Sequence, residues 1–172
     1  SRMLRLGHDV AGNDNLLGGD LENLDKRISF HQMDCNDFES MSKALKNVDI
    51  VYHCAATAHE GLSVFSPNII TKNIFQASVS TITASIKNKV KKFIYCSSMA
   101  RYGDQDTPFH EEMLPKPVDP YGIAKVASEN ILISLAEINK MEWNIVVPHN
   151  IVGPNQKYYD PFRNVLSIFI NR

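Results

Sequence analysis

The sequence predicts an α/β fold in which strands alternate with helices and form a parallel, doubly wound sheet of the Rossmann type. Three observations support this class: short apolar strands recur along the chain, helical stretches separate them, and small or polar residues follow the strand ends. With 172 residues, of which 44% are hydrophobic, the chain is long enough for one domain with a buried core.

The N-terminal half begins with the last turns of a helix over residues 1–7, which Gly7 closes. Three strands follow, each ending in small or polar residues. They are expected at residues 9–13, 28–33 and 48–53. The third strand is almost continuously apolar, which predicts burial on both of its faces.

The C-terminal half contains two long helices, each followed by a strand. A loop is expected over 57–66, and Pro67 then opens a helix that runs to about residue 88. The other elements are a strand at 92–96, a helix at 121–140 and a strand at 143–147.

Composition excludes several classes of function. A net charge of -1 gives no electrostatic case for binding nucleic acid. No apolar run approaches the roughly 20 residues that span a bilayer, so no membrane association is expected. The six histidines show no ligand spacing, so no metal is expected. Cys35, Cys54 and Cys96 follow or end strands, which indicates buried thiols in a reducing cytoplasm.

A tyrosine and a lysine four residues apart open the helix at 121–140. Tyr121 and Lys125 share one helix face, so both can reach one ligand and the ammonium can lower the pKa of the phenol. A phenol with a lowered pKa is a candidate proton-transfer group. In isolation, the same spacing is more typical of an ordinary solvated helix, so the neighbouring motifs must decide.

Ser98 lies in a small polar turn after the strand at 92–96 and precedes Tyr121 by 23 positions. This turn, S-S-x-x-x-Y-G, together with Y-x-x-x-K resembles the extended short-chain dehydrogenase/reductase family, which includes the sugar-nucleotide epimerases and dehydratases. The resemblance implies that Tyr121, Lys125 and Ser98 are catalytic, and that Tyr121 and Lys125 also contact the cofactor. It implies that Ser98 and Asn150 bind the substrate.

Asp14 stands at the tip of the first strand, beside Asn15. In dinucleotide-binding folds an acidic residue here accepts hydrogen bonds from the adenosine ribose and repels the 2′-phosphate of NADP. No Arg or Lys lies between Gly12 and Leu24, so NAD is favoured. An aspartate that merely opens a turn is the alternative.

The resemblance assigns further cofactor contacts at the later strand ends. Together with Asp14 and Asn15, these are Asp34, Cys35, Cys54, Ala55, Ala56, Asn73 and His149. An Asx turn at Asp34 and an exposed Asn73 remain open alternatives. If Asn73 is buried, it must be hydrogen-bonded. His53, within the H-x-A-A motif, is expected to be a core histidine and not a catalyst.

Two positions depart from the family pattern. Family dehydratases carry Asp-Glu directly after the catalytic hydroxyl, where this sequence has Met99 and Ala100, so dehydration is disfavoured and epimerisation or ketone reduction is expected. Val147 stands where Arg is usual in the family's R-x-x-N-x-x-G-P segment, whose remaining residues are matched through Asn150, Gly153 and Pro154.

The resemblance covers residues 1–172 as a partial NAD-binding domain, without the family's first strand, its glycine-rich loop and its C-terminal substrate domain. Strands that flank the absent central strand are expected to face each other across a gap. These 172 residues are therefore interpreted as an internal fragment, inactive alone, of a protein that the resemblance implies is a homodimer.

The function expected from the resemblance is NAD-dependent epimerisation of a nucleotide sugar through a transient keto intermediate. One alternative is an NAD(P)-dependent nucleotide-sugar reductase, which releases its cofactor after each turnover. The other is a non-catalytic or degenerate dinucleotide-binding module, which would not turn over any sugar.

Overall fold

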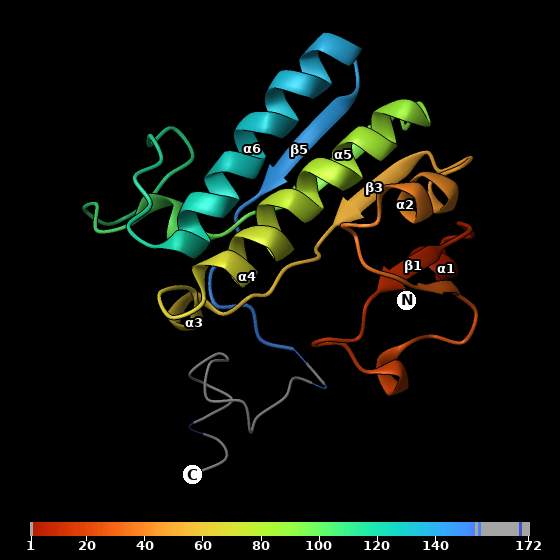
Figure 1. The fold of residues 1–172 in the computed structure, drawn as a ribbon, viewed down its shortest axis with the longest axis horizontal. Helices are drawn as coiled ribbons and strands as arrows, with labels where there is room; N and C mark the ends of the chain where they lie inside the picture. The colour runs from red at the N-terminus through yellow and green to blue at the C-terminus, as the bar shows by residue number, and fades with distance from the viewer. Residues whose placement is uncertain (1, 154, 156–168, 170–172) are drawn as a thin grey trace.

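A computed structural model describes residues 2–153, 155 and 169. Pro154 and most of the segment after it, like Ser1, lie outside the described residues. Two parallel sheets form the framework, and the helices α5 (Ala77–Lys87) and α6 (Pro120–Asn139) run alongside the larger one (Figure 1). The predicted parallel α/β class is confirmed.

The smaller sheet pairs β1 (Ala11–Asp14) with β2 (Ser29–Gln32) in parallel. Their register places Ala11 beside Ser29 and Asp14 beside Gln32, so the ends of both strands meet at one edge. Both strands lie within two residues of their predicted bounds. A short helix, α1 (Arg2–Arg5), precedes them, and Gly7 follows it with φ +83°.

The larger sheet has the order β3 (Ile50–His53), β4 (Lys92–Cys96), β5 (Glu142–Val146), and all its pairs are parallel. His53 pairs with Tyr95, and Cys96 pairs with Val146. The carboxyl ends of the three strands therefore lie at one edge, where ligands bind in open α/β sheets. The predicted bounds of β4 are correct to the residue.

Strands β1 and β3 are not hydrogen-bonded to each other, so the described strands form two sheets instead of one. Residues of both strands line a cavity of about 1380 Å³. β1 and β3 thus lie on either side of this cavity. The cavity continues to the carboxyl ends of both strands, so the gap and the candidate binding region are connected.

The helix predicted from Pro67 is interrupted. It consists of α4 (Pro67–Thr71), one π-helical turn over Lys72–Gln76, and α5. Two shorter helices, α2 (Phe38–Ala44) and α3 (Glu60–Ser63), complete the set in this part of the chain. The loop predicted over 57–66 therefore contains a helical turn, α3. The helix predicted at 121–140 is confirmed as α6.

Helices cover one face of the larger sheet. α5 packs against α2, α6 and β3, and Phe93, Tyr95, Ile82 and Leu132 are fully buried between these elements. Along β3, Val51 and His53 are buried, whereas the alternating residues Ile50 and Tyr52 are 43% and 56% exposed. The prediction that β3 is buried on both faces is therefore wrong for the described residues.

The three cysteines differ in exposure. Cys35 is buried, Cys96 is half-buried and Cys54 is exposed. The prediction of three buried thiols is wrong for Cys54 and only partly right for Cys96, because both lie toward the face of the sheet that the helices leave open. Within the described ranges, no helix has the length and apolar character needed to cross a bilayer.

Gly122 allows α6 to approach the turn that follows β4. A Cβ at this position would lie 2.7 Å from the carbonyl oxygen of Ala100 and 3.0 Å from Pro117 Cβ. Both distances are shorter than ordinary contacts. The oxygen belongs to the backbone and the Pro117 Cβ to a closed ring, so neither atom can rotate away. The close approach brings Tyr121 against the turn that carries Ser98.

We predict that Gly122→Ala lowers the free energy of unfolding by about 1–3 kcal/mol, the usual range for overpacking. Helix propensity alone predicts the opposite sign, a gain of roughly 0.5–1 kcal/mol. Asn130→Ala, on the exposed side of α6, is the control and should be neutral or stabilising. Urea unfolding measures both variants, and a more stable Gly122→Ala protein would contradict the packing argument.

Candidate functional site

Ser98 begins a short turn at the carboxyl end of β4. Its hydroxyl accepts a hydrogen bond from the Ala100 backbone N–H at 3.2 Å and so caps the 3-10 turn Met99–Tyr102. On either side, Ser97 N–H donates to Val146 O at 2.8 Å and Met99 N–H donates to Pro148 O at 3.3 Å. The turn is thus fixed to β5 and to the segment that follows it.

Tyr121 is placed by the first turn of α6. Asp119 is the N-cap and accepts the Gly122 N–H at 2.9 Å, and Pro120 occupies the first helical position, where no N–H is needed. The phenol that follows is buried and lies close enough to Ser98 for that hydroxyl to lower its pKa. Ser98 and Tyr121, separated by 23 positions in sequence, therefore meet.

Lys125 is the third member of this group and is only 3% exposed. Its Nζ donates a 2.7 Å hydrogen bond to the carbonyl oxygen of Cys96 and lies 5.8 Å from the centroid of the Tyr121 ring. Burial lowers the pKa of Lys125 to about 8, although the neighbouring groups Cys96, Cys54 and Glu129 favour its charge. The predicted cluster of Ser98, Tyr121 and Lys125 therefore exists in the structure.

The pKa of Tyr121 differs from the prediction. Burial raises it above the usual value for a phenol, the hydrogen bond with Ser98 acts in the opposite direction, and the negative groups Cys96, Glu60 and Asp119 raise it further. The predicted lowering by Lys125 is therefore wrong in this structure. The physical reason is that desolvation of the phenol outweighs an ammonium whose hydrogen bond is made to a carbonyl group.

A buried carboxylate joins α6 to the turn after β4. Glu129 is 2% exposed, accepts a hydrogen bond from Ser97 Oγ and pairs with Arg101 Nη2 at 3.2 Å. Burial raises the pKa of Glu129, while the bond from Ser97 and the charge of Arg101 lower it. Since Ser97 and Arg101 flank Ser98 in sequence, this contact holds the hydroxyl in place relative to α6.

Asn73 lies in the π-helical turn and is half-buried. Its Nδ2 donates to Thr57 Oγ1 at 3.0 Å, which ties the helix to the segment after β3. The expectation of a hydrogen-bonded Asn73 is confirmed, and the exposed alternative is excluded. A π-helical turn is rare and is found frequently at functional sites. Here it turns an amide toward the cavity that Asn73 and Thr57 line.

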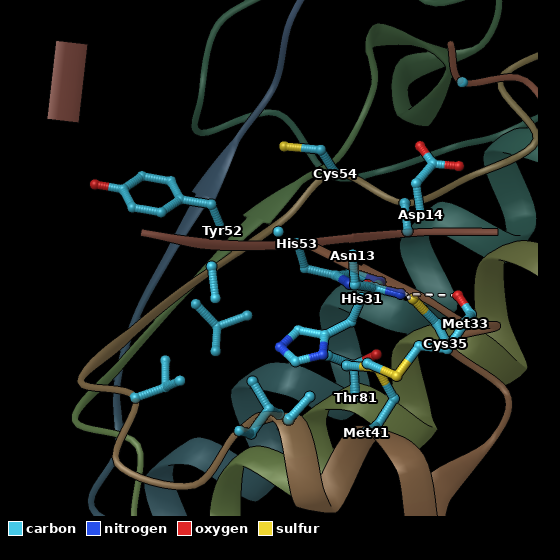
Figure 2. Close-up of a pocket in the computed structure, with 18 of the residues that line it drawn as sticks. Asn13, Asp14, His31, Met33, Cys35, Met41, Tyr52, His53, Cys54 and Thr81 are labelled. Carbon is cyan, nitrogen blue, oxygen red and sulfur yellow. Dashed lines mark hydrogen bonds between the residues drawn. The ribbon is translucent and has the colours of Figure 1, made fainter. Parts of the chain in front are cut away.

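The cavity between the sheets collects the predicted cofactor residues of the first three strand ends (Figure 2). They are Asp14, Asn15, Asp34, Cys35, Cys54, Ala55 and Ala56, and Asn73 of the π-helical turn lines the same cavity. Ser98, Tyr121 and Lys125 do not line this cavity. The structure therefore assembles two groups, a chemical cluster beside β4 and a binding surface along β1 and β3.

Asp14 is exposed at the end of β1 and packs over a glycine. Its Oδ1 accepts the Leu16 N–H at 2.7 Å, and a Cβ at Gly19 would lie 2.7 Å from its Oδ2. Asn15 Oδ1 accepts the Leu17 N–H at 3.0 Å in the same turn. Both side chains thus stabilise the turn, and the carboxylate keeps free lone pairs for a ligand.

The next strand end is held by an asparagine that the motif search did not include. Asn13 Nδ2 donates to Met33 O at 2.9 Å, the dashed line of Figure 2, and its Oδ1 accepts from Cys35 Sγ at 3.4 Å. Asp34 Oδ1 accepts from the backbone and the side chain of Asn36, both at 2.8 Å. Asp34 therefore forms the Asx turn that was its alternative interpretation, while still lining the cavity.

His53 is a core residue, as predicted. It is 4% exposed, and its Nε2 lies 3.1 Å from Ser78 Oγ. Burial, followed by the charge of Lys125, lowers its pKa to about 3, so the ring is neutral at physiological pH. A ring that stays neutral between pH 5 and 8 does not act as a proton donor and acceptor in that range.

His149 and Asn150 follow β5 at the same edge of the sheet and are exposed. Asn150 has a left-handed backbone, with φ 47°, as asparagine tolerates in turns. Their predicted roles toward cofactor and substrate stay predictions.

Several residues of the site escaped the sequence analysis: Asn13, Thr57, Ser97, Arg101 and Glu129. Glu129 had a usable signal, because it continues the four-residue spacing of Tyr121 and Lys125 along one helix face. Asn13 and Thr57 had only their positions at strand ends, which many structural residues share.

The chain matches a sequence model of the NAD dependent epimerase/dehydratase family over residues 1–172. Two curated relatives are a probable UDP-arabinose 4-epimerase 3 from Arabidopsis thaliana, 32% identical over 74% of this chain and 32% of its own length, and a UDP-glucose 4-epimerase from Vibrio cholerae, 32% identical over 78% of this chain and 43% of its own. The chain thus spans less than half the length of these relatives.

Solved structures show the same fold. A UDP-glucose 4-epimerase from Thermotoga maritima, determined with UDP-glucose, superposes with a TM-score of 0.93 at 32% identity, covering 99% of this chain and 57% of that one. A UDP-glucose 4-epimerase from Thermus thermophilus, in complex with NAD, gives 0.94 at 28% identity, covering 99% and 56%.

We predict that Glu129→Ala lowers the free energy of unfolding by about 3–5 kcal/mol, because it leaves the Arg101 charge buried without its partner. Glu129→Gln should cost less, since an amide still hydrogen-bonds Ser97. Glu137→Ala, at an exposed position of the same helix, is the matched control and should change stability by no more than about 0.5 kcal/mol. Equal losses for Glu129→Ala and Glu137→Ala in urea unfolding would show that the buried pair contributes nothing.

Proposed function

Because the chain belongs to the NAD dependent epimerase/dehydratase family, we propose that it is the dinucleotide-binding part of a protein that epimerises a nucleotide sugar. The observation that carries this proposal is the meeting of Ser98, Tyr121 and Lys125 at the carboxyl end of β4. The complete gene product that contains residues 1–172 is called the whole protein. The relatives named as UDP-sugar 4-epimerases suggest a UDP-sugar as substrate.

The residues at the strand ends fit a dinucleotide. Asp14 offers an exposed carboxylate at the tip of β1, the place from which a ribose hydroxyl is bound in this type of fold. The small side chains of Ala55 and Ala56 line the cavity beside β3 and let a ligand approach the backbone. Asn73 and Lys125 supply N–H donors farther along the edge, and the ammonium is suited to ribose hydroxyls.

The three polar side chains then have distinct tasks. A bound NAD supplies a reversible hydride acceptor. Tyr121 takes the proton from the sugar hydroxyl whose carbon is oxidised, and returns it when the carbon is reduced from its other face. Ser98 hydrogen-bonds Tyr121 and holds the reacting oxygen. Lys125 lies beside the phenol and offers N–H donors to the ribose of a bound cofactor.

The turn after Ser98 supports epimerisation over dehydration. Met99 and Ala100 occupy the turn directly after Ser98, where a dehydratase needs an acid and a base. Neither side chain can transfer a proton at neutral pH. An epimerase returns its hydride to the same sugar, so the whole protein should interconvert two UDP-sugars without net formation of NADH, whereas a reductase consumes one reduced cofactor for each product.

We further propose contacts from His149 to the cofactor and from Asn150 to the substrate, supported by their place after β5 at the edge that holds Ser98. A homodimer and a cytoplasmic location complete the proposal. The free thiols of Cys35, Cys54 and Cys96 fit a reducing compartment.

Tyr121→Phe in the whole protein should lower kcat by about 10²–10⁴, the usual contribution of a general acid or base. Stability should change little, because the ring stays in place. Because burial raises the pKa of Tyr121, kcat/KM of the unmodified protein should rise with pH above neutrality. Near-normal turnover by Tyr121→Phe would remove this residue from the mechanism.

Asp14→Ala should narrow the preference of the whole protein for NAD over NADP. The substitution removes the carboxylate that accepts a hydrogen bond from the ribose of NAD, and with it the negative charge that repels the 2′-phosphate of NADP. A charged hydrogen bond is worth about 1.5–3 kcal/mol, so the ratio of the two dissociation constants should change roughly 10-fold to 100-fold. Asp20→Ala removes the same charge from the same loop and should leave the ratio unchanged. Dissociation constants for both cofactors measure it, and equal binding of the two by the unmodified protein would contradict the assignment of Asp14.

A further inference from the structure

Two cysteines lie side by side at the ends of neighbouring strands. The register of β3 and β4 pairs His53 with Tyr95, so Cys54 and Cys96 are the next residues along the two strands. Neighbouring strands lie about 4.7–4.9 Å apart. A disulfide joins residues whose Cα atoms are about 4.4–6.8 Å apart, so residues at the usual inter-strand spacing are within reach of a bridge.

Both thiols lie on the same face of the sheet. The rings of His53 and Tyr95 stack with centroids 5.8 Å apart, and both are buried under the helices. Successive side chains of a strand point to opposite faces, so Cys54 and Cys96 point to the open one. Figure 2 shows Cys54 and His53 leaving the end of β3 in different directions. The Cys54 thiol and the Cys96 thiol lie close enough to shift each other's pKa, so the two side chains converge.

The charged and titratable groups around Cys96 favour its thiolate. Cys54 faces it from the end of β3, and Lys125 and Tyr121 face it from α6. The hydrogen bond from Cys54 and the charge of Lys125 lower the pKa of Cys96 to about 6, against the opposing effect of burial. The same interaction raises the pKa of Cys54, so Cys96 is the sulfur that ionises first.

We propose that Cys54 and Cys96 form a redox-active pair, a modification site at which a hydroperoxide converts two thiols into a disulfide. The exposed Cys54 and the half-buried Cys96 leave the pair open on the face that the helices do not cover. The proposal needs only these contacts and does not depend on the proposed epimerase activity.

The chemistry proceeds in two balanced steps. The Cys96 thiolate attacks one oxygen of hydrogen peroxide, the O–O bond breaks, and the products are Cys96 sulfenic acid and hydroxide. The Cys54 sulfur then attacks the Cys96 sulfur, the S–O bond breaks, and the departing hydroxide takes up the Cys54 proton as water. The proton released on ionisation of Cys96 combines with the hydroxide of the first step to form a second water. In total, two thiols lose two electrons, one peroxide gains them, and two waters form.

The disulfide would change the site in two ways. It removes a negative charge that stabilises the ammonium of Lys125. It also links the two strand ends that precede Ala55-Ala56 and Ser97-Ser98. Oxidation of this pair therefore acts on the binding surface and on the chemical cluster together.

The test uses the whole protein treated with hydrogen peroxide at pH 7, then blocked with N-ethylmaleimide, digested and analysed by mass spectrometry. We expect a peptide pair joined through Cys54 and Cys96, lighter by two hydrogens than the free peptides, with Cys35 alkylated. Alkylation of both Cys54 and Cys96, or cross-links that include Cys35 as often as the proposed pair, would overturn the proposal. The same treatment in concentrated urea shows the pairing that an unfolded chain gives.

Three variants assign the roles of the two sulfurs. Cys35→Ser should keep the cross-link. Cys54→Ser, which retains a hydrogen-bond donor, should leave a Cys96 sulfenic acid that dimedone traps. Cys96→Ser should leave Cys54 largely reduced. The initial rate should rise between pH 5 and 7 and level off above pH 7, because Cys96 is then fully ionised. A rate that climbs about tenfold per pH unit from 7 to 8 would show an ordinary thiol and overturn the role of Cys96.

Discussion

The candidate site depends on the attachment of α6 to the carboxyl end of β4. Lys125 Nζ binds the Cys96 carbonyl, and Glu129, one turn later, binds Ser97 and Arg101. These contacts lie in the interior, where an unpaired charge costs several kcal/mol, so the helix has one favourable position along the strand. That position decides where the hydroxyl of Ser98 meets the phenol of Tyr121, and the absence of a Cβ at Gly122 permits it.

Much of the fold follows from local patterns in the sequence. β4 is predicted to the residue because Lys92–Cys96 is a short apolar strand that ends in a polar turn. α6 is predicted from its Asp119-Pro120 start and its apolar positions. The meeting of Ser98 with Tyr121 was also predictable, because a turn after a parallel strand and the start of the next helix lie at the same edge of a sheet.

Other features depend on tertiary packing and could not be predicted. The pKa of Tyr121 reflects burial and three negative neighbours from distant segments, and the spacing to Lys125 reveals only one of these influences. The open face of β3 depends on which side of the sheet α2, α5 and α6 choose, and an apolar run does not encode that choice. The π-helical turn at Asn73 inserts one extra residue into the helix, and the apolar pattern of the sequence gives no sign of this insertion.

The division of the strands into two sheets has a consequence for cooperativity. Among the described strands, β1 and β2 pair only with each other. Met33, Cys35 and Met41 are among the side chains that join this region to the main core. Such a unit opens with a smaller free energy than the three-stranded sheet, so amide protons of β1 and β2 exchange sooner than those of β4. The carboxylate of Asp14, which we propose binds the ribose, therefore stands on the part of the chain that fluctuates first, while Tyr121 and Lys125 stand on the part that persists.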